Sequence, residues 1–176
     1  VQAELPYLLE FLTIGILPFS LLAVFFPNAL LGISLVFLIY LITKKLINEE
    51  IALASSFIAA VSPWFIFIGR TSYEMIPATF FYLCALYALL ITKGWKILYT
   101  LPFFLLAFYS YIGTKIILLP VAFIFALYCY FFIHKKKFFK QYAALLAILT
   151  VFILFFTYQI THTPGASRLS EIAAPD

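Results

Sequence analysis

Charged residues are scarce in this chain, and their scarcity restricts its class more than any other property. Asp, Glu, Lys and Arg together make up 10% of the 176 residues, whereas 66% of the residues are hydrophobic. Soluble globular domains average about 25% charged residues. The composition therefore excludes an ordinary soluble domain.

Residues that could hold a metal or form disulfides are also few. Cys84 and Cys129 lie in separate apolar stretches without metal-ligand spacing, which predicts small buried hydrophobic side chains. His162 and the scattered glutamates likewise lack the spacing of a zinc site. We expect no metal and no cofactor.

The net charge of +4 does not indicate a nucleic-acid partner. The basic residues cluster at the ends of apolar stretches and form no stripe along a soluble face. Lysines at such positions are typical of membrane proteins, in which they fix the orientation of the helices. The expected partner is the lipid bilayer.

Long apolar stretches fill the chain between Leu5 and Ile160. A helix of roughly 20 apolar residues crosses a hydrocarbon layer of about 30 Å. The sequence predicts an all-α, polytopic transmembrane helix bundle of about six spans in one domain, 1–176. Its parts are an interfacial helix and turn at 1–20, spans in 21–160 and the start of an external loop at 161–176. The expected spans lie near 21–43, 51–69, 75–92, 97–113, 116–133 and 141–160.

The stretch from Leu5 to Leu17 is too short to cross comfortably and ends at Pro18. We expect a short N-terminal helix in the membrane interface. The alternative is one span from Leu5 to about Phe26, kinked at Pro18. Because the chain begins with Val1 and stops in a polar stretch, we also expect an internal fragment of a longer membrane protein.

Lysine and arginine counts predict the orientation. The connections between spans fall alternately on the two sides of the membrane and so form two sets. The set with fewer basic residues, predicted to be the outer one, contains Arg70, Lys115 and Arg168. Because loops rich in Lys and Arg stay in the cytoplasm, the larger set is predicted to be cytoplasmic in a multi-pass protein of the plasma membrane. That set comprises Lys44, Lys45, Lys93, Lys96, Lys135, Lys136, Lys137 and Lys140.

Arg70 is the most informative outer residue, because it follows nineteen residues without a charge. Cations at the ends of packed helices suit a site for an anionic group such as a phosphate. The alternative is an i, i+4 ion pair between Arg70 and Glu74.

Several short motifs follow one another in the order that a known family shows. They are Phe26–Gly32, Ser62–Trp64, Gly69–Glu74, Tyr109–Lys115 and Arg168–Glu171. The ordered set resembles the polytopic glycosyltransferases of the GT-C fold, nearest to the family 39/83 enzymes that include protein O-mannosyltransferases and aminoarabinose transferases. Phe25 stands where that family usually has an arginine, and Glu4–Tyr7 departs from its interfacial pattern.

The resemblance implies a transferase that takes a sugar from a polyprenyl-phosphate donor at the outer face. It implies that Arg70, Lys115 and Arg168 bind the donor phosphate. The family's catalytic carboxylate lies in an earlier external loop, upstream of Val1, so no catalytic residue is assigned. Supporting residues would be Tyr73, Glu74, Tyr109 and Tyr111.

Two other functions are weighed against the transferase. A transporter or channel segment usually carries ionisable groups near the middle of the membrane, and the predicted spans have almost none. A structural multi-pass subunit is compatible with every residue.

Overall fold

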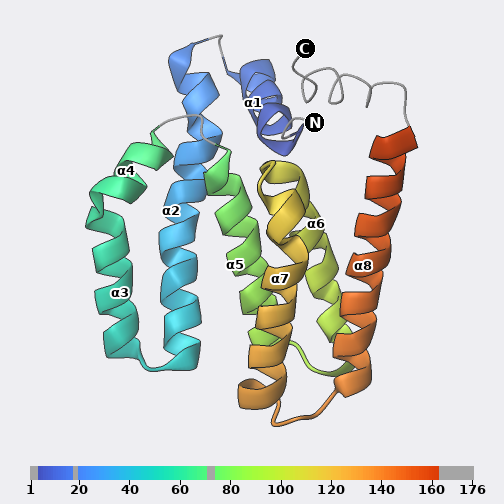
Figure 1. Cartoon of the computed structure of the whole chain (residues 1–176). Coiled ribbons are helices and arrows are strands. Elements are labelled where there is room, and N and C mark those ends of the chain that lie inside the picture. The colour runs from blue at the N-terminus through green and yellow to red at the C-terminus, as the bar shows by residue number, and fades with distance from the viewer. Residues whose placement is uncertain (1–3, 18–19, 71–73, 163–176) are drawn as a thin grey trace, which may run out of the picture.

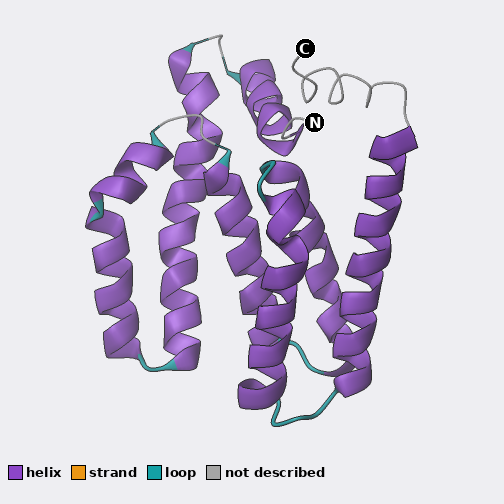
Figure 2. Ribbon diagram, in the orientation of Figure 1, coloured by secondary structure: helices purple, strands orange, loops and turns teal. Residues whose placement is uncertain are grey.

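The computed structural model describes residues 4–17, 20–70 and 74–162, and all regular structure in these ranges is helical (Figures 1 and 2). The expectation of an all-α fold is confirmed. The elements are α1 (Glu4–Ile16), α2 (Leu21–Leu46), α3 (Glu49–Val61), α4 (Pro63–Gly69), α5 (Met75–Ile91), the 3-10 helix η1 (Gly94–Thr100), α6 (Leu101–Ser110), α7 (Thr114–Tyr128), the π-helical turn η2 (Cys129–Ile133) and α8 (Phe139–His162).

The long helices run up and down beside one another. In Figure 1, α3 lies at one side of the bundle and α8 at the other, with α2, α5, α6 and α7 between them. The connections are short, which keeps sequence neighbours antiparallel. As a result, alternate connections lie at opposite ends of the bundle.

Three helical segments in the described ranges are long and apolar enough to cross a membrane: 21–46, 114–133 and 139–159. The pair α3 and α4 makes a fourth if it is counted as one span, but the two helices are bent by 58°. The spans predicted near 75–92 and 97–113 differ from the expectation. Helix α5 has 17 residues, and the stretch 97–113 is divided between η1 and the ten-residue α6.

The bend between α3 and α4 follows from the local sequence. The ring of Pro63 disfavours helical backbone at the residue before it, and Ser62 accordingly has ψ 122°. Proline is favoured in the first turn of a helix, where its missing N–H has no intrahelical partner, and Pro63 begins α4. The span predicted over 51–69 is therefore two helices.

Helix α1 does not continue into α2. Ser20 is extended (φ −153°, ψ 162°), and its hydroxyl accepts a bond from the Ala23 N–H at 3.3 Å, so it caps α2. The Thr13 hydroxyl donates to the Ala23 carbonyl at 2.7 Å, which holds the end of α1 against the start of α2. The structure has a separate short helix rather than one helix kinked at Pro18.

The hydrophobic core lies among α5, η1, α6, α7 and α8. Phe104, Leu118 and Leu145 are fully buried there. An aromatic cluster joins α6 to α8, with the Phe108 ring edge-on to Phe152 and Phe156 at centroid distances of 5.1 and 4.7 Å. Helix α2 contributes to this core mainly through its C-terminal half, with Leu38 and Ile42.

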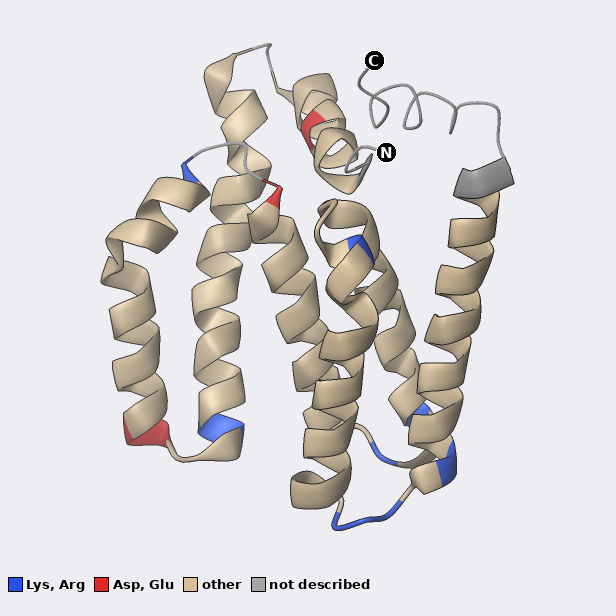
Figure 3. Ribbon diagram, in the orientation of Figure 1, with Lys and Arg blue, Asp and Glu red and all other residues tan. Residues whose placement is uncertain are grey.

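The charged residues gather at the two ends of the bundle (Figure 3). Lys44 and Lys45 occupy the last turn of α2. Arg70 caps α4 at the opposite end, and Lys115 lies in the first turn of α7 at that same end. The bundle thus separates the lysine-rich connections from Arg70 and Lys115, as the alternation of spans predicts.

Candidate functional site

Arg70 ends helix α4. Its N–H bonds the carbonyls of Ile66 and Phe67 at 3.2 and 3.3 Å, and its side chain is exposed. Among the described residues it has no ion-pair partner, and it does not bridge to Glu74. The i, i+4 alternative is therefore not what the structure shows, and the guanidinium is available to an anion from outside the described chain.

Glu74 is held by a neutral group instead. The Tyr7 hydroxyl of α1 donates to Glu74 Oε1 at 3.3 Å, which ties α1 to the start of α5. The negative charge of Glu74 raises the pKa of Tyr7. Partial burial, and then the charge of Glu74, raise the pKa of Glu10. The charge of Glu74 therefore acts on both Tyr7 and Glu10 at the Arg70 end of the bundle.

The ammonium group of Lys115 lies over two aromatic rings. Its ammonium nitrogen lies 5.7 Å from the centroid of Phe108 and 5.2 Å from that of Phe156, within the range of cation–π attraction. Tyr109 packs edge-on against Phe108 at 5.3 Å and is half-buried. The rings of α6 and α8 thus set the position of the ammonium group.

The turn before Lys115 is tightly built. The buried Thr114 hydroxyl donates to the Ala107 carbonyl at 2.8 Å and also to the Tyr111 carbonyl. A side chain at Gly113 would place its Cβ 2.5 Å from Cε1 of Tyr111, so the turn requires glycine there unless the ring moves. Tyr111 therefore has a packing role in the α6–α7 turn.

The structure brings three predicted site residues to one end of the bundle. Arg70, Glu74 and Lys115 come from the ends of α4, α5 and α7 (Figure 3). Arg70 lies on the α2–α4 side and Lys115 over the rings of α6 and α8, so they belong to different surroundings. Binding of one anion by both stays a prediction. Tyr73 and Arg168 lie outside the described residues.

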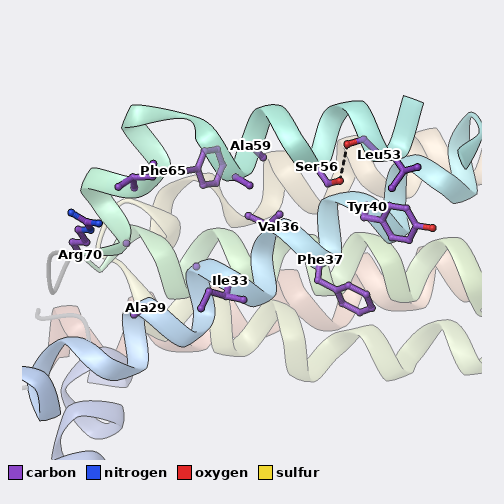
Figure 4. Close-up of a pocket in the computed structure, with 14 residues that line it drawn as sticks. Ala29, Ile33, Val36, Phe37, Tyr40, Leu53, Ser56, Ala59, Phe65 and Arg70 are labelled. Carbon is purple, nitrogen blue, oxygen red and sulfur yellow. Dashed lines mark hydrogen bonds between the residues drawn. The ribbon is translucent and has the colours of Figure 1, made fainter. Parts of the chain in front are cut away.

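A groove of about 800 Å³ runs between α2 and the α3–α4 pair (Figure 4). The sequence alone does not predict this groove, although small residues on the facing helices are a usable signal for it. Gly32 approaches α4 so closely that an added Cβ would lie 3.9 Å from the Gly69 Cα. The groove is lined by Ala29, Gly32, Ile33, Val36, Phe37, Tyr40, Leu53, Ser56, Ala59, Ala60, Phe65, Ile66, Gly69 and Arg70.

The two ends of this groove differ in charge. Arg70 of α4 and Ala29 of α2 lie at the same end. At the other end the Tyr40 hydroxyl donates to Glu49 Oε1 at 3.1 Å and accepts from Lys44 at 3.2 Å. Lys44 and Glu49 also form an ion pair at 3.0 Å. One end therefore presents a cation, Arg70, that has no ion-pair partner within the described ranges, and the other presents a pair whose charges balance.

The described part of the chain contains no group of three or more His, Cys, Asp or Glu side chains that could hold a metal ion. Its chemistry would come from Arg70, Lys115 and the carboxylates Glu10 and Glu74. Such a set can bind an anionic ligand and stabilise charge that develops on it.

The family model described as dolichyl-phosphate-mannose-protein mannosyltransferase matches residues 5–160. No curated protein and no solved structure matches the chain significantly.

Proposed function

The chain belongs to the dolichyl-phosphate-mannose-protein mannosyltransferase family, and from this premise we propose that it is part of a GT-C type glycosyltransferase that takes a sugar from a polyprenyl-phosphate donor. The family supports a membrane glycosyltransferase; the donor class is our proposal. The observation that carries it is Arg70, an exposed arginine without an ion-pair partner among the described residues, at the end of the bundle opposite the lysine-rich connections.

Transfer of the sugar leaves negative charge on the lipid phosphate. A fixed cation lowers the barrier when it contacts the phosphate oxygens where that charge develops. A guanidinium can contact two phosphate oxygens at once, so we assign this role to Arg70, with Lys115 and Arg168 as further cations. Glu74 and the tyrosines 73, 109 and 111 would support the site. The base that deprotonates the acceptor is not assigned.

We propose that the chain crosses the plasma membrane six times. Helices α2, α7 with η2, and α8 are long enough alone. The bent pair α3–α4, the shorter α5 and the broken segment η1–α6 would supply the other three. In this arrangement the lysine-rich end is cytoplasmic and Arg70 and Lys115 face outside, as the excess of lysine at one end favours.

Cysteine labelling of intact cells tests this orientation in the full-length protein. Ile112, exposed in the turn between α6 and α7, and Lys136, exposed between α7 and α8, lie at opposite ends. We expect Ile112→Cys to react with a membrane-impermeant maleimide and Lys136→Cys to react only after permeabilisation. The reverse result would invert the proposed topology. The native Cys84 and Cys129, inside helical segments, provide the background signal.

The test of the function is Arg70→Ala in the full-length protein. We expect sugar transfer from a polyprenyl-phosphate sugar to fall by about a hundredfold or more, as when one transition-state donor is removed from an oxyanion site. Membrane insertion and protein level should stay nearly normal, because the side chain is exposed and has no ion-pair partner among the described residues. Transfer is measured per folded molecule.

Two further variants separate catalysis from structure. Arg70→Lys should recover part of the activity, because an ammonium keeps the charge but not the two-pronged contact. Glu74→Gln should keep the Tyr7 bond through the amide oxygen and change activity far less than Arg70→Ala. Unchanged specific activity in Arg70→Ala would end the assignment of this residue to the donor phosphate.

A further inference from the structure

Six lysines gather on two connections at the end of the bundle opposite Arg70. One connection leads from α5 into η1, and the other joins η2 to α8 (Figure 3). A Cβ added at Gly94 would lie 4.0 Å from Cε1 of Phe138, so the two connections pack against each other. All six lysine side chains are exposed. We call them the lysine surface: Lys93, Lys96, Lys135, Lys136, Lys137 and Lys140.

Counterions for the lysine surface are absent from the nearby sequence. The chain contains no Asp or Glu between Glu74 and Glu171. None of the six lysines has an ion-pair partner in the ranges that the structure describes. Burial, and then the charge of Lys93, lower the pKa of the neighbouring His134, which shows that this charge reaches the groups around it. An anion that neutralises the lysine surface therefore comes from outside the described chain.

The other lysine-rich connection at this end is built differently. Lys44 and Lys45 lie in the last turn of α2, where the helix dipole favours cations, and Lys44 pairs with Glu49 at 3.0 Å. Lys140, in contrast, lies in the first turn of α8, where the dipole disfavours a cation. Helix stability therefore accounts for the lysines of the α2–α3 connection but not for Lys140.

The backbone that carries the lysine surface is fixed in a costly conformation. Lys135, Lys136 and Phe138 have φ of 47°, 62° and 66°, which residues other than glycine rarely adopt. The Lys136 N–H donates to the Tyr130 carbonyl at 2.8 Å, and the next N–H, that of Lys137, donates to another backbone carbonyl at 2.9 Å. Backbone strain that the surroundings hold in place is typical of functional sites. The lysines are thus presented by a defined turn.

Exposed aromatic side chains flank the lysine surface. Trp95 and Tyr99 of η1 and Phe132 of η2 are 62%, 68% and 72% exposed. Trp and Tyr are enriched where a protein meets the headgroup region of a bilayer. A soluble phosphate would make no use of these rings, whereas a phospholipid places its phosphate near the lysines and its acyl chains near the rings. The surroundings therefore favour an anionic lipid.

We propose that the lysine surface binds the phosphate of an anionic glycerophospholipid, with the exposed rings of η1 and η2 against its acyl chains. Clusters of lysine beside a membrane-spanning helix attract such headgroups. The inference uses the proposed crossing of the membrane. It depends neither on sugar transfer nor on which end of the bundle is cytoplasmic.

The chain offers a matched pair of double substitutions. Lys137→Gln with Lys140→Gln removes two charges from the lysine surface and leaves the residues of positive φ unchanged. Lys44→Gln with Lys45→Gln removes the same number of charges from the α2–α3 connection at the same end of the bundle. Any effect of net charge alone should therefore appear equally in both variants.

The experiment is native mass spectrometry of the full-length protein in detergent, titrated with phosphatidylglycerol or with phosphatidylcholine. We expect the wild type to bind phosphatidylglycerol more tightly. One lysine at a membrane surface is worth about a fivefold gain in binding to anionic lipid, so the Lys137→Gln, Lys140→Gln variant should bind phosphatidylglycerol about 25-fold more weakly. Its binding of phosphatidylcholine should not change, and the Lys44→Gln, Lys45→Gln variant should lose far less.

Three results would overturn the inference. Equal affinity of the wild type for the two lipids is the first, and that comparison needs no variant to fold. Equal weakening in the two double variants is the second, because net charge would then explain the binding. Displacement of phosphatidylglycerol by millimolar inorganic phosphate is the third, since it would assign the surface to a soluble anion.

The Arg70→Ala variant separates this inference from the proposed function. Arg70 lies at the opposite end of the bundle, so Arg70→Ala should bind phosphatidylglycerol like the wild type. Sugar transfer is measured separately. A lipid preference without transfer refutes only the proposed function, and transfer without a lipid preference refutes only this inference.

Discussion

The α5–α8 side of the bundle and the α2–α4 side are packed in different ways. On the first side, large side chains such as Phe104, Phe108 and Leu145 are fully buried against one another. On the second, the buried residues of α3 and α4 are Ala52, Ala59 and Ile68. Helix α3 packs mainly against α2 and α4. The first side supplies a core, and the second leaves an open apolar groove with Arg70 at its end.

This difference suggests a division of roles. Buried side chains that fit together hold α5–α8 in one arrangement and thereby position the ends of α5 and α7, where Glu74 and Lys115 lie. Helices that meet through alanine and glycine leave space that a ligand can occupy. Stability should therefore depend mainly on the first side.

The largest expected effect is on the core. Phe104→Ala should lower the free energy of unfolding by about 3–5 kcal/mol, because it leaves a cavity among fixed neighbours such as Tyr82, whose ring centroid lies 6.4 Å away. Phe37→Ala, at a groove-lining residue with 62% exposure, should cost less than about 1 kcal/mol. Unfolding of the full-length protein in detergent micelles measures both.

Equal losses in these two variants would contradict the comparison. They would mean that Phe37 is as tightly packed as Phe104 in the assembled protein, with another segment over the groove. A large loss at Phe104 alone would show that the α2–α4 side is open in solution as well.

A smaller effect is expected from pH, through His134 in the connection between α7 and α8. The ring is buried, with Nδ1 2.6 Å from the Tyr142 hydroxyl and no partner for Nε2 among the described residues. Burial, and then the nearby charge of Lys93, lower the pKa of His134 from its ordinary value of 6.5. The folded protein therefore favours the neutral ring.

The sign of the pH dependence follows from this lowered pKa. As the pH falls through 6.5, the unfolded chain binds a proton before the folded protein does. Stability should be greatest well above pH 6.5, decrease as the pH falls through 6.5, and level off only below the lowered pKa of the folded protein. Denaturant titrations at several pH values measure the slope. His134→Gln should flatten it, and an unchanged slope would assign the dependence to another group.

The smallest effect is expected at the hairpin between α2 and α3. Glu49→Gln removes the charge from the ion pair with Lys44, and both side chains are exposed. Exposed pairs contribute little because water and salt screen them. We expect a small decrease in melting temperature that disappears at high salt, measured beside the wild type. A large decrease that survives high salt would show that this connection is buried in the assembled protein.

Local rules and composition predict much of this fold. The apolar stretches predict an all-α fold. Pro18 and Pro63 mark places in the sequence near which helices end. The difference between one span over 51–69 and two bent helices was harder to predict, because proline is tolerated both at a kink and in a first turn. Hydropathy over a window has no information about the backbone angle at Ser62.

The candidate site was predictable only in part. The isolation of Arg70 in the sequence singled it out, and the structure places it at the same end as Glu74 and Lys115. The groove was not predicted, because Gly32 comes near Gly69 only when α2 and α3–α4 pack side by side. Sequence spacing within one helix does not show which face of another helix it meets.

The sequence by itself determined that this chain is helical and membrane-embedded, because apolar stretches of this length can satisfy their backbone groups in lipid only as helices. It also determined the separation of the charges, since all the lysines except Lys115 lie in alternate connections. Only the tertiary structure decided that Arg70 ends an apolar groove and that Glu74 bonds to Tyr7. Those facts depend on contacts between residues distant in sequence, whose geometry is fixed by packing.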